Sequence, residues 1–281
     1  VTVSGLPTGL KYVAATAAIV GVPSAAVVDK PVKVVAKNVS LASSQQVFLL
    51  TVEPLSAWAQ GAFNGTADHE ALGGGVASMT VSARGAATGK LTLRGTNYGF
   101  SAASYAARDE QGVFALTATA KVGKVAWPLS LRVAVPAVTG GVGVASGTLA
   151  KAEGSLGSNG WVSVYRNVWK DPGMAAVAAP YAGYYTAALP GCSEYGSGYL
   201  LFTVDAAGGV KAAGKLADGT AVSQSATLIL DEGGRAFAVL YVAPSAYKGG
   251  GLFGLAELFR REAGGRVIVR PLDGGPLLWQ S

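Results

Sequence analysis

The sequence has very little of the side-chain chemistry on which most catalytic and metal sites depend. It contains one cysteine, Cys192, and one histidine, His69, among 281 residues. A single cysteine excludes an intrachain disulfide, a cysteine metal cluster and a Cys-x-x-Cys redox pair. A single histidine removes most zinc sites and leaves His69 as the base of any Ser-His-Asp triad. Because His69 lies in the polar run 66–70, we expect an exposed loop histidine, and we predict no metal, no cofactor and no catalytic residue.

Charged residues are scarce as well. They make up 14% of the chain, compared with roughly 25% in an average globular protein, whereas 50% of the residues are hydrophobic. Intrinsic disorder needs the opposite balance and is excluded. The net charge is +6, but the basic residues are dispersed and gather only at Arg260-Arg261. A nucleic-acid-binding protein concentrates its basic residues on one patch or helix, so we expect no nucleic acid partner.

Long hydrophobic runs are missing. The most apolar stretch, residues 13–28, is interrupted by Gly21 and Pro23. It is also shorter than the roughly 20 apolar residues that a membrane-spanning helix needs. We therefore expect no membrane insertion.

Glycine, by contrast, is abundant, with 40 residues. Segments such as 78–82, 90–94 and 129–133 alternate apolar and polar residues, which is typical of half-buried strands. Turn signals such as Arg84-Gly85 and Asp218-Gly219 separate them at short intervals. This pattern predicts an all-β fold of antiparallel barrels or sandwiches. The one helix-like stretch, 252–259, could also be a buried strand, since Gly254 weakens a helix.

Two parts of the chain repeat one another. Five residues recur in the same order, about 122 to 125 positions later: Gly61, Val81, Gly85, Gly95 and Phe114 correspond to Gly183, Val204, Gly208, Gly219 and Phe237. The run Gly89-Lys90-Leu91 likewise matches Gly214-Lys215-Leu216. This internal duplication predicts two related antiparallel β-modules, at 54–136 and 180–281, joined by a connecting segment at 137–179.

The first 53 residues differ in kind. They contain Gly5-Leu6-Pro7-Thr8-Gly9-Leu10, then Ile19-Val20-Gly21-Val22-Pro23, and later a closing Thr51-Val52 strand. Residues 3–53 resemble the immunoglobulin-like repeats of large bacterial surface proteins. This segment departs from the repeats at Ala17, where the family usually has glycine. Such a sandwich needs about seven strands in about 100 residues, so we predict a partial Ig-like β-domain at 1–53. We also expect both ends of the chain to continue into something longer.

The resemblance implies a large secreted or cell-surface bacterial protein, and the duplicated region is similar to Gly-rich β-modules that follow such repeats. We therefore predict a non-catalytic structural or adhesive segment. A partial sandwich leaves an open sheet edge, and open edges recruit strands. The expected partners are the rest of a larger parent chain or neighbouring subunits, through β-edge pairing.

Two alternatives remain open. A carbohydrate-binding module would use exposed aromatic rings, and the candidate ligand-binding residues are Trp161, Trp169, Tyr181 and Tyr185. We favour a place in a core or a seam for them, because aromatic residues more often bury. A glycoside-active enzyme would need two carboxylates about 5–10 Å apart.

The acidic residues and the nearest phosphate-loop motif argue against an enzyme. Most aspartates stand beside glycine, where turns use them. Residues 209–216 match the phosphate-binding loop motif except at the last position, where Leu216 replaces the required Ser or Thr.

Overall fold

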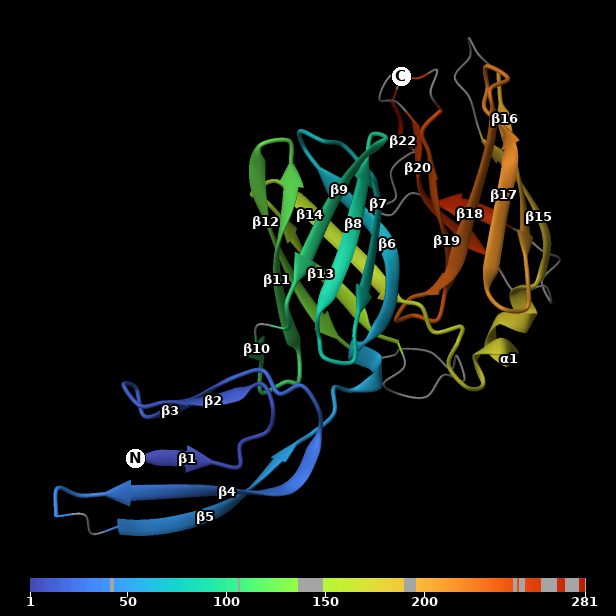
Figure 1. Ribbon diagram of the computed structural model, residues 1–281. Coiled ribbons are helices and arrows are strands. Elements are labelled where there is room, and N and C mark those ends of the chain that lie inside the picture. Colours follow the sequence, from blue (N-terminus) through green and yellow to red (C-terminus); the bar gives the residue numbers. More distant parts are fainter. Residues whose placement is uncertain are drawn as a thin grey trace.

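β-Strands are the main secondary structure of the described residues, with one short α-helix and two 3-10 helices (Figure 1). A computed structural model describes residues 1–40, 43–105, 107–135, 149–189, 196–244, 247, 251–258, 267–270 and 278–280. All strand pairings within these ranges are antiparallel, which confirms the predicted all-β class. In the described part of the chain, no helix has the length and apolar character needed to cross a membrane.

The N-terminal strands form two small sheets that project away from the rest of the described chain (Figure 1). Their bounds are β1 (Thr2–Ser4), β2 (Leu10–Val13), β3 (Ala18–Gly21), β4 (Val27–Lys37) and β5 (Ser43–Val52). The sheet order is β1-β4-β5, and β2 and β3 form a separate hairpin. Ala17, where the resembled repeats have glycine, adopts a φ of 51° in the hairpin turn. Glycine is the residue that this backbone conformation favours.

The next strands form a nine-stranded sheet in the order β10-β11-β12-β13-β14-β6-β7-β8-β9. After the 3-10 helix η1 (Ala57–Ala59), its strands are β6 (Gly61–His69), β7 (Gly75–Val81), β8 (Ala87–Leu93), β9 (Thr96–Ala102), β10 (Ala107–Arg108), β11 (Phe114–Val122), β12 (Val125–Ala134), β13 (Lys151–Leu156) and β14 (Gly160–Arg166). Strands β9 and β11 contact each other, so the sheet curls into a near-closed barrel. Alternate side chains along each strand fill the barrel interior. On β8, Leu91 and Leu93 are buried while Lys90 points outward.

The first barrel continues past residue 136. Strands β13 and β14 lie in the segment expected to connect the modules, yet β13 pairs with β12 and β14 pairs with β6. They belong there because Val162 and Val164 alternate into the barrel core. The pairing is also close, since a Cβ on Gly65 of β6 would lie 2.1 Å from the Ser163 carbonyl oxygen of β14.

The C-terminal strands form a second, eight-stranded sheet that curves into a half-barrel. After α1 (Met174–Ala178) and η2 (Ala179–Tyr181), its strands are β15 (Gly183–Leu189), β16 (Gly198–Val204), β17 (Gly209–Lys215), β18 (Ala221–Leu230), β19 (Ala236–Val242), β20 (Gly251–Leu258), β21 (Val267–Arg270) and β22 (Leu278–Gln280). The helix-like stretch is therefore strand β20. The core of this second sheet contains Phe202, Leu228 and Leu240, all buried.

Repeated glycines occupy corresponding places in the two sheets. Gly85 has a φ of 79° and donates its N–H to the Ser82 carbonyl, while Gly208 has a φ of 77° and donates to the Asp205 carbonyl. Each glycine closes the turn that leads out of the second strand of its sheet. The Gly-Lys-Leu match does not correspond in the same way. Gly89 pairs with Met79, near the preceding turn, whereas Gly214 pairs with Leu200, farther from it.

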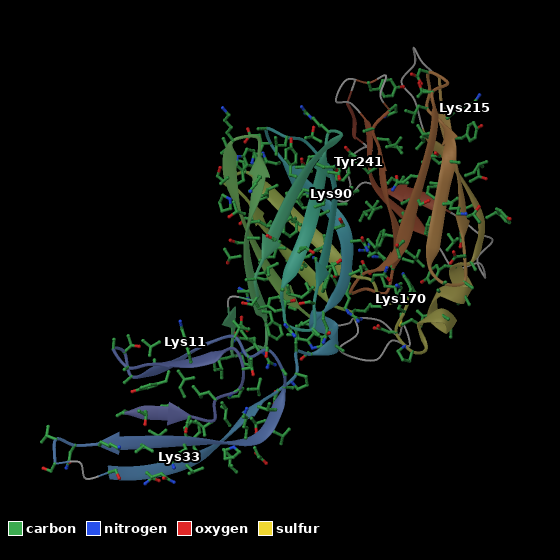
Figure 2. The ribbon with its side chains drawn as sticks, viewed as in Figure 1. Lys11, Lys33, Lys90, Lys170, Lys215 and Tyr241 are labelled. Atoms are coloured by element: carbon green, nitrogen blue, oxygen red, sulfur yellow. The ribbon has the colours of Figure 1, made fainter. Side chains whose placement is uncertain are left out.

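The two large sheets pack against each other along a seam. Ile229, Phe237, Val239 and Leu255 of β18–β20 form a buried apolar cluster, against which Val76 of β7 and Tyr165 of β14 pack. The Gly95 N–H donates a hydrogen bond to the Tyr241 hydroxyl, and Tyr241 lies between the sheets in Figure 2. The sheets therefore share buried apolar surface and do not merely follow one another along the chain.

Candidate functional site

Three of the four candidate aromatics lie in the hydrophobic core beneath the second sheet. Trp169, Tyr181 and Tyr185 are buried. The Trp169 indole N–H donates to the Leu228 carbonyl at 2.5 Å, and the Tyr185 hydroxyl donates to the Tyr181 carbonyl at 2.6 Å. The core position that the sequence favours is thus confirmed for these three, and they leave the candidate ligand-binding set, because a ring packed in the core has no free face for a sugar. Trp161 is half-buried on β14 and lies outside that core.

His69 is not the exposed loop residue that its polar neighbours predict. It ends strand β6 and is buried. Its Nδ1 accepts the Ala71 N–H at 3.1 Å, and its ring lies 4.0 Å from the Trp127 ring, centroid to centroid. The ring is buried because it packs against Trp127 and finds its polar partner in the backbone of the β6–β7 turn.

Several aspartates beside glycine are turn residues, as the sequence predicts. One carboxylate oxygen of Asp205 accepts the N–H groups of Ala207 and Gly209, each at 2.8 Å. Asp231 does the same for Gly233 and Arg235, at 2.9 Å and 2.8 Å. These bonds hold hairpin turns together. In the described part of the chain, no group of three His, Cys, Asp or Glu side chains could hold a metal ion.

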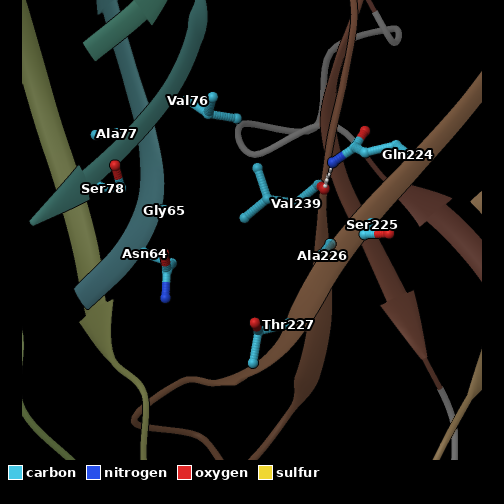
Figure 3. Close-up of a pocket in the computed structure, with 10 residues that line it drawn as sticks. All are labelled: Asn64, Gly65, Val76, Ala77, Ser78, Gln224, Ser225, Ala226, Thr227 and Val239. Carbon is cyan, nitrogen blue, oxygen red and sulfur yellow. Dashed lines mark hydrogen bonds between the residues drawn. The ribbon is translucent and has the colours of Figure 1, made fainter. Parts of the chain in front are cut away.

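A cleft of about 310 Å³ opens at the seam between the two sheets (Figure 3). Its lining residues come from β6, β7, β18 and β19: Asn64, Gly65, Val76, Ala77, Ser78, Gln224, Ser225, Ala226, Thr227 and Val239. All of them are neutral, and the polar ones are amides and hydroxyls. Such a lining can hydrogen-bond, but it supplies no nucleophile with a base beside it.

A small group of ionisable residues lies at the same seam. The Lys151 ammonium contacts the Glu153 carboxylate at 2.6 Å and lies 5.5 Å from the centroid of the Tyr165 ring. Burial raises the pKa of the Tyr165 hydroxyl, and the Lys151 charge opposes that rise. Lys151 is thus held between a carboxylate and an aromatic ring.

The N-terminal sheets have almost no core of their own. In the described part of residues 1–53, Pro7 and Val32 are the buried residues. Strand β5 pairs with β4, and no other strand of the described residues pairs with its second edge. Val47 and Leu49 on this strand are 54% and 64% exposed. Because residues 43–52 carry no charge, the edge lacks the lysines that usually prevent pairing between sheets.

Comparisons with known proteins assign no relative. No family model, no curated protein and no solved structure matches this chain.

Proposed function

We propose that this chain is a non-catalytic structural or adhesive segment of a large secreted or cell-surface bacterial protein. In this proposal residues 1–53 join it to a neighbouring subunit through β5. The observation that carries the proposal is an uncharged edge strand, with exposed apolar side chains, on a sheet that lacks a core. Such a sheet gains stability when another strand extends it.

The chemistry elsewhere in the described residues supports a structural role. His69 accepts a backbone N–H of a turn, Asp205 and Asp231 hold hairpin turns, and Trp169, Tyr181 and Tyr185 fill a core. Each of these groups is engaged in stabilising the fold, and the seam cleft is lined by neutral residues.

The energetic reason for pairing lies in the exposed side chains of β5. Phe48 pairs with Val32, which is buried, so Val47 and Leu49 point to the opposite, outer face. Fully burying a valine or leucine side chain contributes about 1.5–3 kcal/mol. An added strand would bury part of both side chains and satisfy the open backbone groups of the edge.

Self-association of the purified chain tests this proposal. Sedimentation velocity over a wide concentration range should show a reversible dimer of the wild-type chain. The double variant Val47→Lys/Leu49→Lys should stay monomeric, since lysines on an edge strand oppose pairing. The matched control is Val28→Lys/Val39→Lys, which adds the same charge at exposed valines outside β5 and should still dimerise. A wild-type chain that is monomeric throughout, or a control that dissociates equally, contradicts the proposal.

A further inference from the structure

The outer face of β15, β16 and β17 is exposed and carries two tyrosines. Alternation sends Tyr185, Phe202 and Ala212 into the core and their neighbours outward. Tyr184 is 87% exposed, Tyr199 43% and Leu201 50%. Large apolar side chains this exposed on adjacent strands form a surface patch, which marks an interaction site more often than isolated exposed residues do.

The strand register places these side chains in order across the face. Tyr184 is opposite Thr203, Leu201 is opposite Thr186, and Tyr199 is opposite Ala188. Strands lie about 4.8 Å apart and same-face residues about 7 Å apart along a strand. The three large side chains therefore lie at intervals of roughly 7 Å over about 14 Å. Together they form an elongated strip rather than a compact pocket.

Positive charge lies along one side of this strip. On β17, Lys211 is opposite Thr203 and Lys215 is opposite Tyr199. Both lysines are exposed, and Lys215 lies at the end of its strand (Figure 2). The outward side chains of these three strands include no carboxylate among the described residues. Asp205 and Asp218, in the turns at the two ends of β17, accept N–H groups of their own turns.

We infer that this face binds an acidic polysaccharide. The apolar C–H face of a sugar ring packs on the exposed rings of Tyr184 and Tyr199, and Leu201 extends the same surface between them. Lys211 and Lys215 pair with carboxylate or sulfate groups, and the neighbouring threonine hydroxyls hydrogen-bond to sugar hydroxyls. The strip, the cations and the absence of facing carboxylates all match a linear, negatively charged, ring-containing polymer.

The same features favour a polysaccharide over the other anionic partners. Single-stranded nucleic acid is bound in a groove whose many cations follow the phosphates, whereas this face has two lysines. An anionic membrane surface requires a larger apolar face that inserts among the lipids, and here Leu201 is the one large aliphatic side chain on the strip. The inference does not depend on β5, which lies in another sheet.

Affinity for sulfated dextran, with unmodified dextran of equal length as the neutral control, tests the inference. Wild-type chain should bind the sulfated polymer and bind the neutral one far more weakly. Tyr184→Ser and Tyr199→Ser should each weaken binding about tenfold, since exposed rings of this kind contribute more than 1 kcal/mol at contact sites. Far-ultraviolet circular dichroism and the melting temperature should stay unchanged, because both side chains point outward.

Charge-matched variants separate a site from general attraction to a basic protein. Lys211→Gln/Lys215→Gln and Lys121→Gln/Lys124→Gln remove the same charge, but the second pair lies at the β11–β12 hairpin of the other sheet. The first should weaken binding strongly and the second slightly. Equal losses in both, or tyrosine variants that bind like wild type, overturn the inference. So does tighter binding to single-stranded DNA or to anionic vesicles than to sulfated dextran.

Discussion

Gly208 meets two requirements at one position. Its φ of 77° lies in the region that side chains with a Cβ disfavour. A Cβ there would also lie 2.6 Å from the indole of Trp169. Because Trp169 is buried and its N–H is hydrogen-bonded to Leu228, the ring has little freedom to move away. The turn glycine and the core tryptophan are therefore coupled.

We predict that Gly208→Ala destabilises the chain more than Gly219→Ala does. Gly219 has a φ of 85° but nothing within 4 Å of the added Cβ, so its substitution costs the backbone strain alone, about 1–2 kcal/mol. Gly208→Ala adds the clash with Trp169 and should lose at least about 1 kcal/mol more. Urea denaturation of both variants measures the difference. Equal losses would show that Trp169 adjusts freely.

At the residue scale, the sequence predicts roles well where they are local. The aspartates in Gly-rich turns make the expected backbone hydrogen bonds, because an Asp needs only its own neighbours for that. For Tyr184 and Tyr185, the alternation of side chains along a strand is a local signal that separates the exposed ring from the buried one. The two tyrosines are adjacent on a strand and must face opposite sides, yet the predicted ligand-binding set contains the buried Tyr185 and not the exposed Tyr184. His69 needed tertiary information, since Trp127 covers it from another strand.

At the scale of elements, β18 changes its pairing along its length. Residues 221–227 pair with β17, whereas pairing with β19 is limited to Leu228–Leu230. Where β18 and β19 diverge, the Gln224 side chain bridges the gap. Its amide nitrogen donates to the Val239 carbonyl at 2.7 Å, and its amide oxygen accepts the Tyr241 N–H at 2.7 Å. One side chain thus replaces a missing pair of backbone hydrogen bonds, of which Figure 3 shows the bond to Val239.

We predict that Gln224→Met lowers the free energy of unfolding by about 2 kcal/mol. Methionine keeps the length of the side chain but leaves a part-buried carbonyl and N–H without that partner. Ser223→Ala, on the exposed side of the same strand, is the control and should change stability by less than about 0.5 kcal/mol. Amide hydrogen exchange should also quicken at Tyr241. An unchanged exchange rate at Tyr241 in the methionine variant would mean that the Gln224 hydrogen bonds do not stabilise this strand pair.

Element types were predictable because alternation and glycine turns are local signals, and the all-β class follows from them. The assignment of strands to sheets was not. Strands β13 and β14 fall in the predicted connecting segment, because the strand that pairs with β14, β6, lies about 90 to 100 residues earlier in the sequence. No periodicity within a short window records such a partner. Gln224 was missed for the same reason, since its role depends on where two strands diverge.

At the scale of the whole molecule, the seam decides whether the two large sheets behave as one body. Val239 and Leu255 of the second sheet are buried there, although they point away from that sheet's own core. Taken alone, either sheet would expose its side of the seam to water. Each such side chain contributes about 1.5–3 kcal/mol when buried, so the seam couples the two cores by several kcal/mol. The two large sheets should therefore unfold together.

We predict one calorimetric unfolding transition for the two large sheets and its division into two in Val239→Asp. An aspartate at the seam places a charge among apolar side chains, at a cost that exceeds the coupling. Each core stays intact, because Val239 belongs to neither. Leu201→Asp, on the exposed outer face of the same sheet, is the control and should keep the single transition. Two transitions already in the wild-type chain would show that the seam is too weak to couple the sheets, and that each curls into a stable unit by itself.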